Sequence, residues 1–176
     1  MTIKHTDMEG TERNNVKRIP YGISGFEGVR ERNCYYVDKT AYIERIEEAH
    51  DFFFFIRPRR FGKSLLLSTL ENYYDLNKKE KFQELFGDLY IGQHPTPLRN
   101  SYLVLSLNFS TISSQDGGYK KSLDRHCLIQ FRSFCNRYAS LLPQDALQEL
   151  NSFPDAISQF QLIATSVRKS IKRFTF

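Results

Sequence analysis

The sequence of 176 residues has few cysteines. Cys34, Cys127 and Cys135 are an odd number at wide spacings, which fits neither a disulfide framework nor a paired-cysteine zinc site. His126 beside Cys127 does not suit a metal or a catalytic dyad, because neighbouring side chains on a helix point in different directions. We therefore expect reduced thiols that pack within helices.

The sequence also lacks long hydrophobic runs. No apolar stretch approaches the roughly 18 residues that a membrane-spanning helix needs, and residues 1–15 lack the apolar core of a secretion signal. These absences predict a soluble, cytoplasmic protein without a membrane partner. The content of 40% apolar and 26% charged residues is that of a folded domain. We expect residues 1–16 to form a flexible leader and residues 17–176 to belong to the domain.

The net charge by itself indicates little, but the distribution of charged residues along the chain is more informative. The formal net charge of +5 permits contact with anions, but many folded domains carry as much without binding one. Arg57, Arg59, Arg60 and Lys63 fall within seven residues at the end of an apolar run. This clustering predicts an anionic partner at that place.

Two apolar runs predict strands. Phe52 to Ile56 is five consecutive apolar residues, the pattern of a strand that is buried on both faces of a parallel sheet. Tyr102 to Phe109 is mainly apolar and partly alternating, and predicts a second strand. The helix expected after the first run has an apolar face made by Leu66, Leu67, Leu70, Tyr73 and Tyr74. This order predicts an α/β fold in which helices flank a parallel sheet.

Residues 119–142 predict a long amphipathic helix, and Pro143 and Pro154 each fit the first turn of a further helix. A short helix over residues 79–86 is expected to end at Gly87 in the left-handed conformation. The apolar face of the long helix is expected to contain Leu123, Cys127, Phe131, Phe134 and Tyr138. That of the last helix is expected to contain Ile157, Phe160, Ile163, Ala164 and Val167.

The segment Asp38-Lys39-Thr40 precedes residues with helical spacing, Ile43 and Ile46. Aspartate and threonine are good N-cap residues because their side-chain oxygens accept hydrogen bonds from free backbone N–H groups. We expect Asp38 or Thr40 to cap the helix that follows.

Residues 57–64 match a phosphate-binding loop, G-x-x-x-x-G-K-[ST], at all but the first position. Gly62 would let the backbone approach phosphate oxygens, Lys63 would place its ammonium on the β and γ phosphates, and Ser64 would offer a hydroxyl to Mg²⁺. The start of the following helix would add free N–H groups. The alternative is a solvated basic turn ahead of a core helix, because Arg57 replaces the first glycine.

The sequence resembles a family of bacterial AAA-ATPase-like proteins that often carry a C-terminal nuclease-like domain of the PD-(D/E)XK type. One matching stretch is Ile19-Pro-Tyr-Gly-Ile-Ser-Gly-Phe-Glu-Gly-Val-Arg30 followed by Tyr35-Tyr-Val-Asp-Lys-Thr40. The other is Phe55-Ile-Arg-Pro-Arg-Arg-Phe-Gly-Lys-Ser-Leu-Leu-Leu-Ser68, similar to the variant Walker A loop of that family, which tolerates arginine first. The resemblance implies a P-loop fold that binds ATP and Mg²⁺.

Carried over to this sequence, the family pattern implies that the nucleotide is bound by Arg59, Arg60, Phe61, Gly62, Lys63 and Ser64, with Ser64 reaching the metal. It also implies a link to nucleic acid through a nuclease-like domain that this chain does not contain.

ATP hydrolysis needs an acidic residue at the end of another apolar strand. The nearest candidate, residues 103–109, contains Asn108 at that position and brings no negative charge. We therefore expect the N-terminal portion of a longer ATPase domain, which binds nucleotide but does not hydrolyse it alone. Loss of later strands would expose a sheet edge, and a protein partner or a second copy is expected to cover it.

Two other functions stay open. A basic interaction module would use the arginines to contact nucleic acid, with strong salt dependence and no need for Mg²⁺. A small-molecule kinase would also pair a phosphate loop with basic residues, but no acid that activates an acceptor can be named near the loop.

Overall fold

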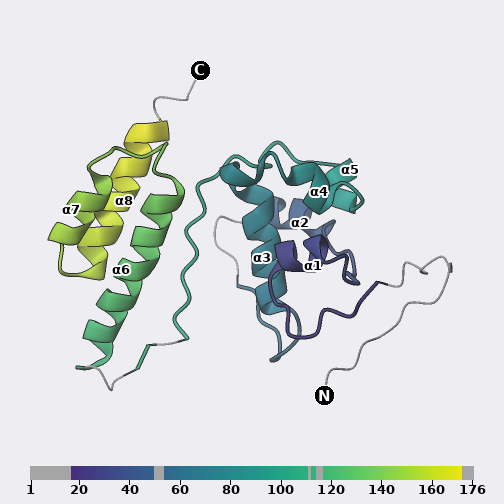
Figure 1. Ribbon diagram of the computed structural model, residues 1–176, viewed down its shortest axis with the longest axis horizontal. Coiled ribbons are helices and arrows are strands. Elements are labelled where there is room, and N and C mark those ends of the chain that lie inside the picture. The colour runs from purple at the N-terminus through teal and green to yellow at the C-terminus, as the bar shows by residue number, and fades with distance from the viewer. Residues whose placement is uncertain (1–16, 50–53, 111, 114–116, 172–176) are drawn as a thin grey trace, which may run out of the picture. The chain divides into compact units, whose positions relative to one another are not determined.

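The computed structural model describes residues 17–49, 54–110, 112–113 and 117–171. These residues form helices joined by turns and extended segments, and none of them lies in a β-strand. The expected α/β fold with a parallel sheet is therefore wrong for the described residues (Figure 1). Their helices are α1 (Phe26–Glu31), α2 (Tyr42–Glu48), α3 (Lys63–Tyr74), the 3-10 helix η1 (Leu76–Lys78), α4 (Phe82–Phe86), α5 (Tyr90–Gln93), α6 (Tyr119–Arg137), α7 (Ala146–Ser152) and α8 (Ala156–Ile171).

The runs expected to be strands are extended chain instead. Residues 54–56 and 103–109 have no strand pairing, and residues 52–53 lie outside the described residues. Pairing in the described chain is limited to isolated parallel bridges, Arg18 with Cys34 and Asp75 with Tyr102. A strand needs a continuous ladder to a neighbour, and an apolar run by itself does not supply one. The described residues accordingly present no sheet edge, so the expected partner at such an edge is not supported.

The chain divides into two compact units. The first unit consists of Met1–Tyr73 and Asn77–Asn100, and the second of Tyr74–Leu76 and Ser101–Phe176. Helices α1, α2, α4 and α5 belong to the first unit, together with all but the last residue of α3. Helices α6, α7 and α8 belong to the second unit.

Aromatic side chains from short helices build the core of the first unit. Phe26 of α1 stacks on Phe86 of α4 with ring centroids 4.7 Å apart, and Tyr73 of α3 meets Phe86 edge-on at 5.6 Å. Burial of each such side chain contributes about 1.5–3 kcal/mol, so these contacts hold helices that are too short to be stable alone. The fully buried apolar residues of this core include Phe26, Val29, Tyr73, Leu85, Phe86 and Ile91.

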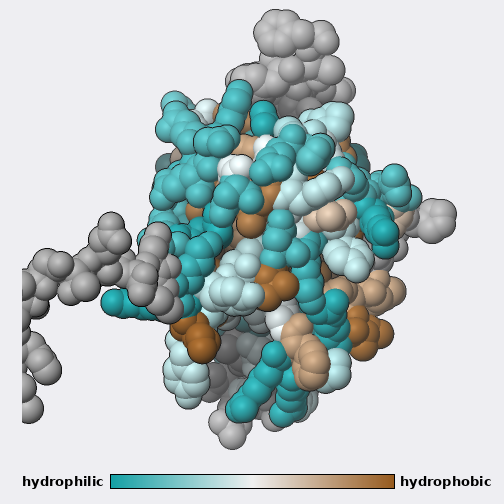
Figure 2. Space-filling model, turned by 90° about the vertical axis from the view of Figure 1, so that its right-hand side faces the viewer, coloured by the Kyte–Doolittle hydropathy of each residue, from teal (hydrophilic) through white to brown (hydrophobic). Residues whose placement is uncertain are grey.

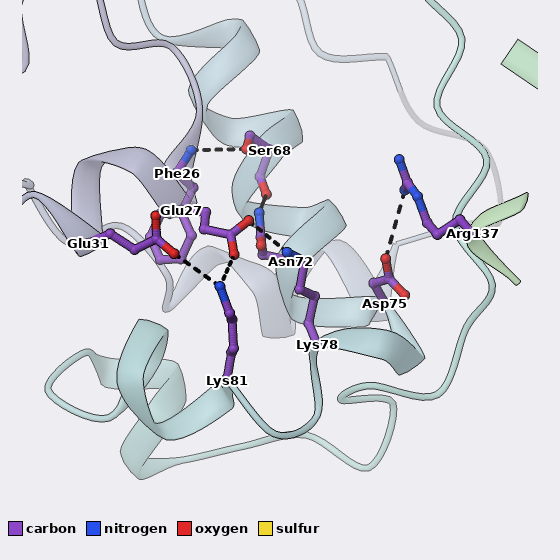
Figure 3. A network of polar contacts seen from close by, with 9 residues as sticks. All are labelled: Phe26, Glu27, Glu31, Ser68, Asn72, Asp75, Lys78, Lys81 and Arg137. Carbon is purple, nitrogen blue, oxygen red and sulfur yellow. Dashed lines mark hydrogen bonds and ion pairs between the residues drawn. The ribbon is translucent and has the colours of Figure 1, made fainter. Parts of the chain in front are cut away.

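Side chains from distant segments cap two of these short helices. The backbone N–H of Phe26, in the first turn of α1, donates to Ser68 Oγ of α3 at 2.9 Å (Figure 3). At the start of α5, the N–H of Tyr90 donates to Asp38 Oδ2 at 2.8 Å, and the N–H of Ile91 donates to Thr40 Oγ1 at 3.1 Å. Asp38 and Thr40 therefore cap α5. Helix α2, which the sequence led us to expect them to cap, has no side-chain cap.

A cluster of charges links α1 to the chain that follows α3. Glu27 accepts hydrogen bonds from Lys78 at 2.6 Å and from Lys81 at 2.8 Å, and Lys81 also reaches Glu31 at 3.0 Å (Figure 3). Hydrogen bonds from Lys78 and Lys81 lower the pKa of the Glu27 carboxyl. This depressed pKa makes the cluster a pH-dependent part of the first unit's stability.

Helix α8 packs against α6 and α7 in the second unit. Phe131, Phe134 and Tyr138 are buried on α6 as expected, and Leu123 packs against the same core. Cys127 and Cys135 are buried free thiols whose pKa values burial raises, and Cys34 is a buried free thiol of the first unit. No helix in the described ranges has both the length and the apolar character to cross a membrane.

The apolar face expected for α8 is partly wrong. Ile163 is buried and Val167 packs against the core, but Ile157 and Phe160 are 73% and 51% exposed. The helix is turned so that Gln159 and Ser166 are buried with Ile163. At the start of the helix the N–H of Ala156 donates to Asp124 Oδ1 of α6 at 2.8 Å, which ties the first turn of α8 to α6.

Two further expectations are corrected. Helix α4 ends before Gly87, but Gly87 has φ −55° in the right-handed region and not the left-handed one. Glycine is needed there for space, because a Cβ would lie 2.5 Å from the backbone oxygen of Gln83.

On α3, Tyr73 is buried as expected, whereas Leu67 is exposed and Thr69 is buried instead.

Thr40→Val should lower the free energy of unfolding by about 1–3 kcal/mol. Valine keeps the shape of the buried Thr40 side chain but leaves the buried N–H of Ile91 without its acceptor. Thr165→Val is the matched control, because the exposed Thr165 hydroxyl only donates to Gln161 O in the same helix. Urea denaturation followed by circular dichroism measures both, and equal values for the two variants would contradict the capping role.

Glu27→Gln should remove an acid-sensitive part of the stability. Because the folded pKa is below the ordinary value of 4.5, the ion pairs stabilise the protein above that pH, and this stability is lost as the pH falls through the folded pKa. The difference between wild type and Glu27→Gln should therefore be largest near neutral pH and shrink as the pH falls below 4.5. Urea denaturation across pH measures it. Glu84→Gln, at an exposed position of α4, is the matched control and should change the free energy of unfolding less than Glu27→Gln does at neutral pH.

Candidate functional site

Residues 57–64 form a curled loop that leads directly into α3. The N–H of Phe61 donates to Pro58 O at 3.4 Å, and the N–H of Leu66 donates to Gly62 O at 2.9 Å, which joins the loop to the helix. Arg60 and Gly62 have φ of 67° and 76°, in the left-handed region. Two left-handed residues so close together bend the backbone back on itself. The sequence match to a phosphate loop therefore coincides with a turn that encloses space at the start of a helix.

The side chain of Lys63 folds back over this loop. Its Nζ donates to the carbonyl oxygens of Arg57 at 2.6 Å and Pro58 at 3.0 Å. These bonds hold the ammonium at the mouth of the turn. A Cβ placed on Gly62 would have no heavy atom within 4 Å, so the space beside this glycine is open. The loop thus combines a held cation with room for a ligand group next to the backbone.

A cavity of about 610 Å³ adjoins the loop within the first unit. Phe61 and Gly62 of the loop form part of its wall, with Leu66 and Thr69 of α3 beyond them. The rest of the wall comes from α2 and from the chain before it, including Tyr35, Tyr36, Val37, Tyr42 and Ile46. Most of this wall is apolar or aromatic, a common character of small-molecule sites.

Among the described residues that line the cavity, every charged side chain is a cation. Lys39, Arg45 and Arg57 line it. The Arg45 guanidinium lies over the Tyr42 ring, 5.3 Å from its centroid, and that of Arg57 lies over Phe55 at 4.8 Å. Such cation–π contacts fix the orientation of both partners. The site is therefore suited to an anion with an apolar or aromatic part.

The structure brings only some of the predicted site residues to the cavity. Phe61 and Gly62 line it, and Lys63 is at the mouth of the turn. Arg59, Arg60 and Ser64 are exposed and do not belong to the wall. Arg59 and Arg60 belong to the loop itself and Ser64 to the first turn of α3.

The aromatic wall is the part of the site that sequence analysis missed. Tyr42 and Arg45 are one helical turn apart on α2, and this spacing was the available signal. Tyr36 is partly buried, and desolvation by burial raises the pKa of its hydroxyl although a hydrogen bond to Thr69 acts in the opposite direction. This contact joins the wall to α3. Ser68 of the same helix, five residues beyond its start, accepts a hydrogen bond from the N–H of Phe26.

A metal centre made by protein side chains alone is not present in the described ranges, where no three His, Cys, Asp or Glu residues come together in a suitable group. A divalent cation at this site would have to use ligand oxygens in addition to protein atoms.

Comparison with known proteins places the chain in a class of ATPase-like proteins. A family model described as a predicted AAA-ATPase matches residues 20–171, which is most of the chain. The chain belongs to this family. The expected resemblance is thereby confirmed at the level of the family.

One curated relative is a protein of Azotobacter chroococcum mcd 1, named as an uncharacterized protein in the vnfD 5' region. It is 44% identical over 63 residues, which make up 35% of this chain and 12% of the relative. The chain thus spans only a small part of this relative. No solved structure matches the chain.

Gly62→Ala should destabilise the loop, because an alanine at φ 76° costs about 1–2 kcal/mol. Gly28→Ala is the control, because we expect it to change the stability in the opposite direction. Gly28 lies in α1, a Cβ there would meet only Ile23 Cγ2 at 3.4 Å, and alanine should stabilise the helix by up to about 1 kcal/mol. Urea denaturation measures both values. A neutral effect of Gly62→Ala would show that the left-handed backbone at this position is not required.

Proposed function

We propose that the loop at residues 57–64 binds the phosphates of a nucleotide, with ATP and Mg²⁺ as the natural ligands. The observation that carries the proposal is the position of Lys63, whose ammonium is held over a left-handed turn at the start of a helix of 12 residues. Membership of the AAA-ATPase family supports the same function. The mostly apolar wall of the neighbouring cavity, with the cations Lys39, Arg45 and Arg57, suits an anionic ligand that has an apolar part.

Each loop residue has a physical role in this proposal. Lys63 exchanges its bonds to the carbonyls of Arg57 and Pro58 for bonds to phosphate oxygens, which are stronger acceptors because they are charged. Gly62 leaves the backbone open to the phosphates. The free N–H groups in the first turn of α3 add hydrogen bonds and the positive end of the helix dipole. Arg59 and Arg60, both exposed, add positive charge on the outside of the loop.

Mg²⁺ fits this set of donors only together with the nucleotide. Ser64 is exposed in the first turn of α3 and offers one hydroxyl oxygen. Magnesium commonly takes one or two protein ligands, and phosphate oxygens and waters complete its octahedron. Bound there, the metal would neutralise phosphate charge. Ser64 would hold it, and Lys63 would hold the phosphates.

The proposal concerns binding and not hydrolysis. None of the described residues lining the cavity is an aspartate or a glutamate that could orient a water molecule. The curated relative is much longer than this chain, so the activity of such a longer protein is a separate question.

The second candidate, contact with nucleic acid, is favoured by one observation: Arg57, Arg59 and Arg60 are close in the sequence and all exposed. Phosphate contacts of this kind weaken steeply with added salt and do not need a divalent metal. Nucleotide held through Ser64 should instead bind more tightly with Mg²⁺ present. A titration with and without the metal at two salt concentrations separates the two functions.

Lys63→Ala should lower the affinity for Mg²⁺-ATP by about 10- to 100-fold, the value of one charge-assisted hydrogen bond that is lost from a phosphate. Isothermal titration calorimetry measures it, and circular dichroism with urea denaturation verifies that the variant is folded. Lys79→Ala, at an exposed lysine outside the loop, is the matched control and should bind as wild type does. Unchanged affinity in folded Lys63→Ala would refute the proposed function.

A further inference from the structure

Exposed apolar side chains do not by themselves mark a further site in this protein. Figure 2 shows hydrophobic side chains at the surface among hydrophilic ones on one face of the molecule. Single exposed apolar residues are normal in folded proteins and do not indicate a ligand. The second unit has a different feature, a pocket of about 620 Å³ that several charged and polar side chains line. Its wall comes from the first half of α6, the end of α7 and the chain leading into the first turn of α8.

The start of α6 brings positive charge to this pocket. Lys120 and Lys121 line it from the first turn of the helix, which contains no acidic residue and, within the described chain, has no side-chain cap. The first N–H groups of a helix are free and form the positive end of its dipole. Cations are unfavourable there, whereas an anion is bound favourably. The start of this 19-residue helix is therefore suited to an anionic ligand.

Two cations of the pocket have no counterion. Lys120 pairs with Asp124 Oδ2 at 3.2 Å, and Asp124 Oδ1 accepts the first N–H of α8, so this carboxylate is already engaged on both oxygens. Lys121 and Arg125, one helical turn apart, form no hydrogen bond or ion pair with another described residue. The stem of Lys121 lies against Gly117, where an added Cβ would come within 3.0 Å of Lys121 Cδ. The pocket thus keeps two free positive charges next to each other.

Gln159 adds a buried hydrogen-bond acceptor that has no donor. Its side chain lines the pocket and is only 1% exposed. Its Nε2 donates to Phe153 O at 2.8 Å, which fixes the orientation of the amide because only the nitrogen can donate to a carbonyl. Gln159 Oε1 is buried and accepts no hydrogen bond from the described residues. A buried acceptor in this state costs about 1–3 kcal/mol, which a donor group of a ligand would remove.

We propose that this pocket binds a small phosphate monoester that carries hydroxyl groups, such as a sugar phosphate. The monoester has a charge of about −1.5 to −2 at neutral pH, which matches Lys121 and Arg125 at the start of α6. A hydroxyl of the ligand donates to Gln159 Oε1, and the partly exposed ring of Phe153 contacts the carbon skeleton. Carboxylates bring less charge, and inorganic phosphate brings no skeleton.

This site is independent of the proposed nucleotide site. All residues that line the pocket belong to the second unit, whereas the loop at residues 57–64 belongs to the first. Binding of a sugar phosphate in the second unit therefore needs neither Lys63 nor Mg²⁺.

The test is titration of the full nitrogen-15-labelled chain, without Mg²⁺, with glucose 6-phosphate and with glycerol 3-phosphate, followed by nuclear magnetic resonance. The backbone amide signals of Gly117, Lys121 and Arg125 should shift, and those of residues 57–64 should not. The side-chain amide signal of Gln159, assigned by its loss in Gln159→Met, should shift with both probes. Ethyl phosphate, which has no hydroxyl on its skeleton, should shift the signals of α6 and leave that of the Gln159 side chain in place.

Substitutions test the separate contacts. Arg125→Gln and Lys121→Gln should each lower the affinity for glucose 6-phosphate by about 10- to 100-fold, the value of one charge-assisted hydrogen bond. Gln159→Met should lower it by about 2- to 10-fold and leave the affinity for ethyl phosphate unchanged. Lys169→Gln, at an exposed lysine of α8 outside the pocket, is the matched control and should bind as wild type does. Urea denaturation followed by circular dichroism verifies that each variant is folded.

The results that would overturn the sugar phosphate site leave the nucleotide site untouched. They are an unchanged affinity in folded Arg125→Gln, or equal affinities of the wild type for glucose 6-phosphate and ethyl phosphate. Shifts confined to residues 57–64 would also overturn it, because the probes would then lie on the loop. Absence of any shift with both hydroxylated probes would do the same, while binding of Mg²⁺-ATP would still be decided by Lys63→Ala.

Discussion

The first unit depends on one constraint, which is that the free N–H groups at the start of a helix need acceptors. Helices α1 and α5 have 6 and 4 residues, too few to be stable in isolation. Neither has a cap of its own, and both receive their acceptors from elsewhere in the chain. Ser68 supplies one to α1, and Asp38 and Thr40 supply two to α5. Each of these bonds therefore ties two separate segments together as well as ending a helix.

The same bonds position the candidate site. Ser68 lies on α3 one turn beyond Ser64, so its bond to the N–H of Phe26 fixes the start of the helix against α1. Phe26 is itself held by its stack on Phe86. On the other side of the cavity, Thr40 and its partner on α5 fix the chain just before α2, which carries Tyr42. The loop and the aromatic wall are thus attached to one core.

The opening stretch that resembles the family contributes both to the scaffold and to the cavity. Its residues Phe26, Asp38 and Thr40 are part of the scaffold, while Tyr35 and Tyr36 between them form part of the cavity wall. A capping acceptor has to be placed within a few tenths of an ångström of its donor. Substitution there would move α1 or α5, and with them the position of the loop.

The sequence predicts those elements that depend on local pattern. The buried face of α6 and the start of α3 behind Gly62 follow from helical spacing and from a glycine before a helix. The strands were wrong because a ladder needs a neighbour that a local pattern does not contain. The caps were assigned to the wrong helix for the same reason, since Asp38 and Thr40 act on residues about fifty positions away. Nor does the spacing of α8 show that Asp124 of α6 accepts a hydrogen bond from its first turn.

The apolar run before the loop is extended although it is not a strand. Phe54 and Ile56 are 93% and 88% exposed, whereas Phe55 between them is half-buried and lines the cavity. This alternation is that of an extended chain, in which successive side chains point to opposite sides. An extended approach to Arg57 suits the proposed phosphate loop, because the turn must begin at a defined place. The segment meets that need through Phe55, which packs into the cavity wall and carries the Arg57 guanidinium on its ring.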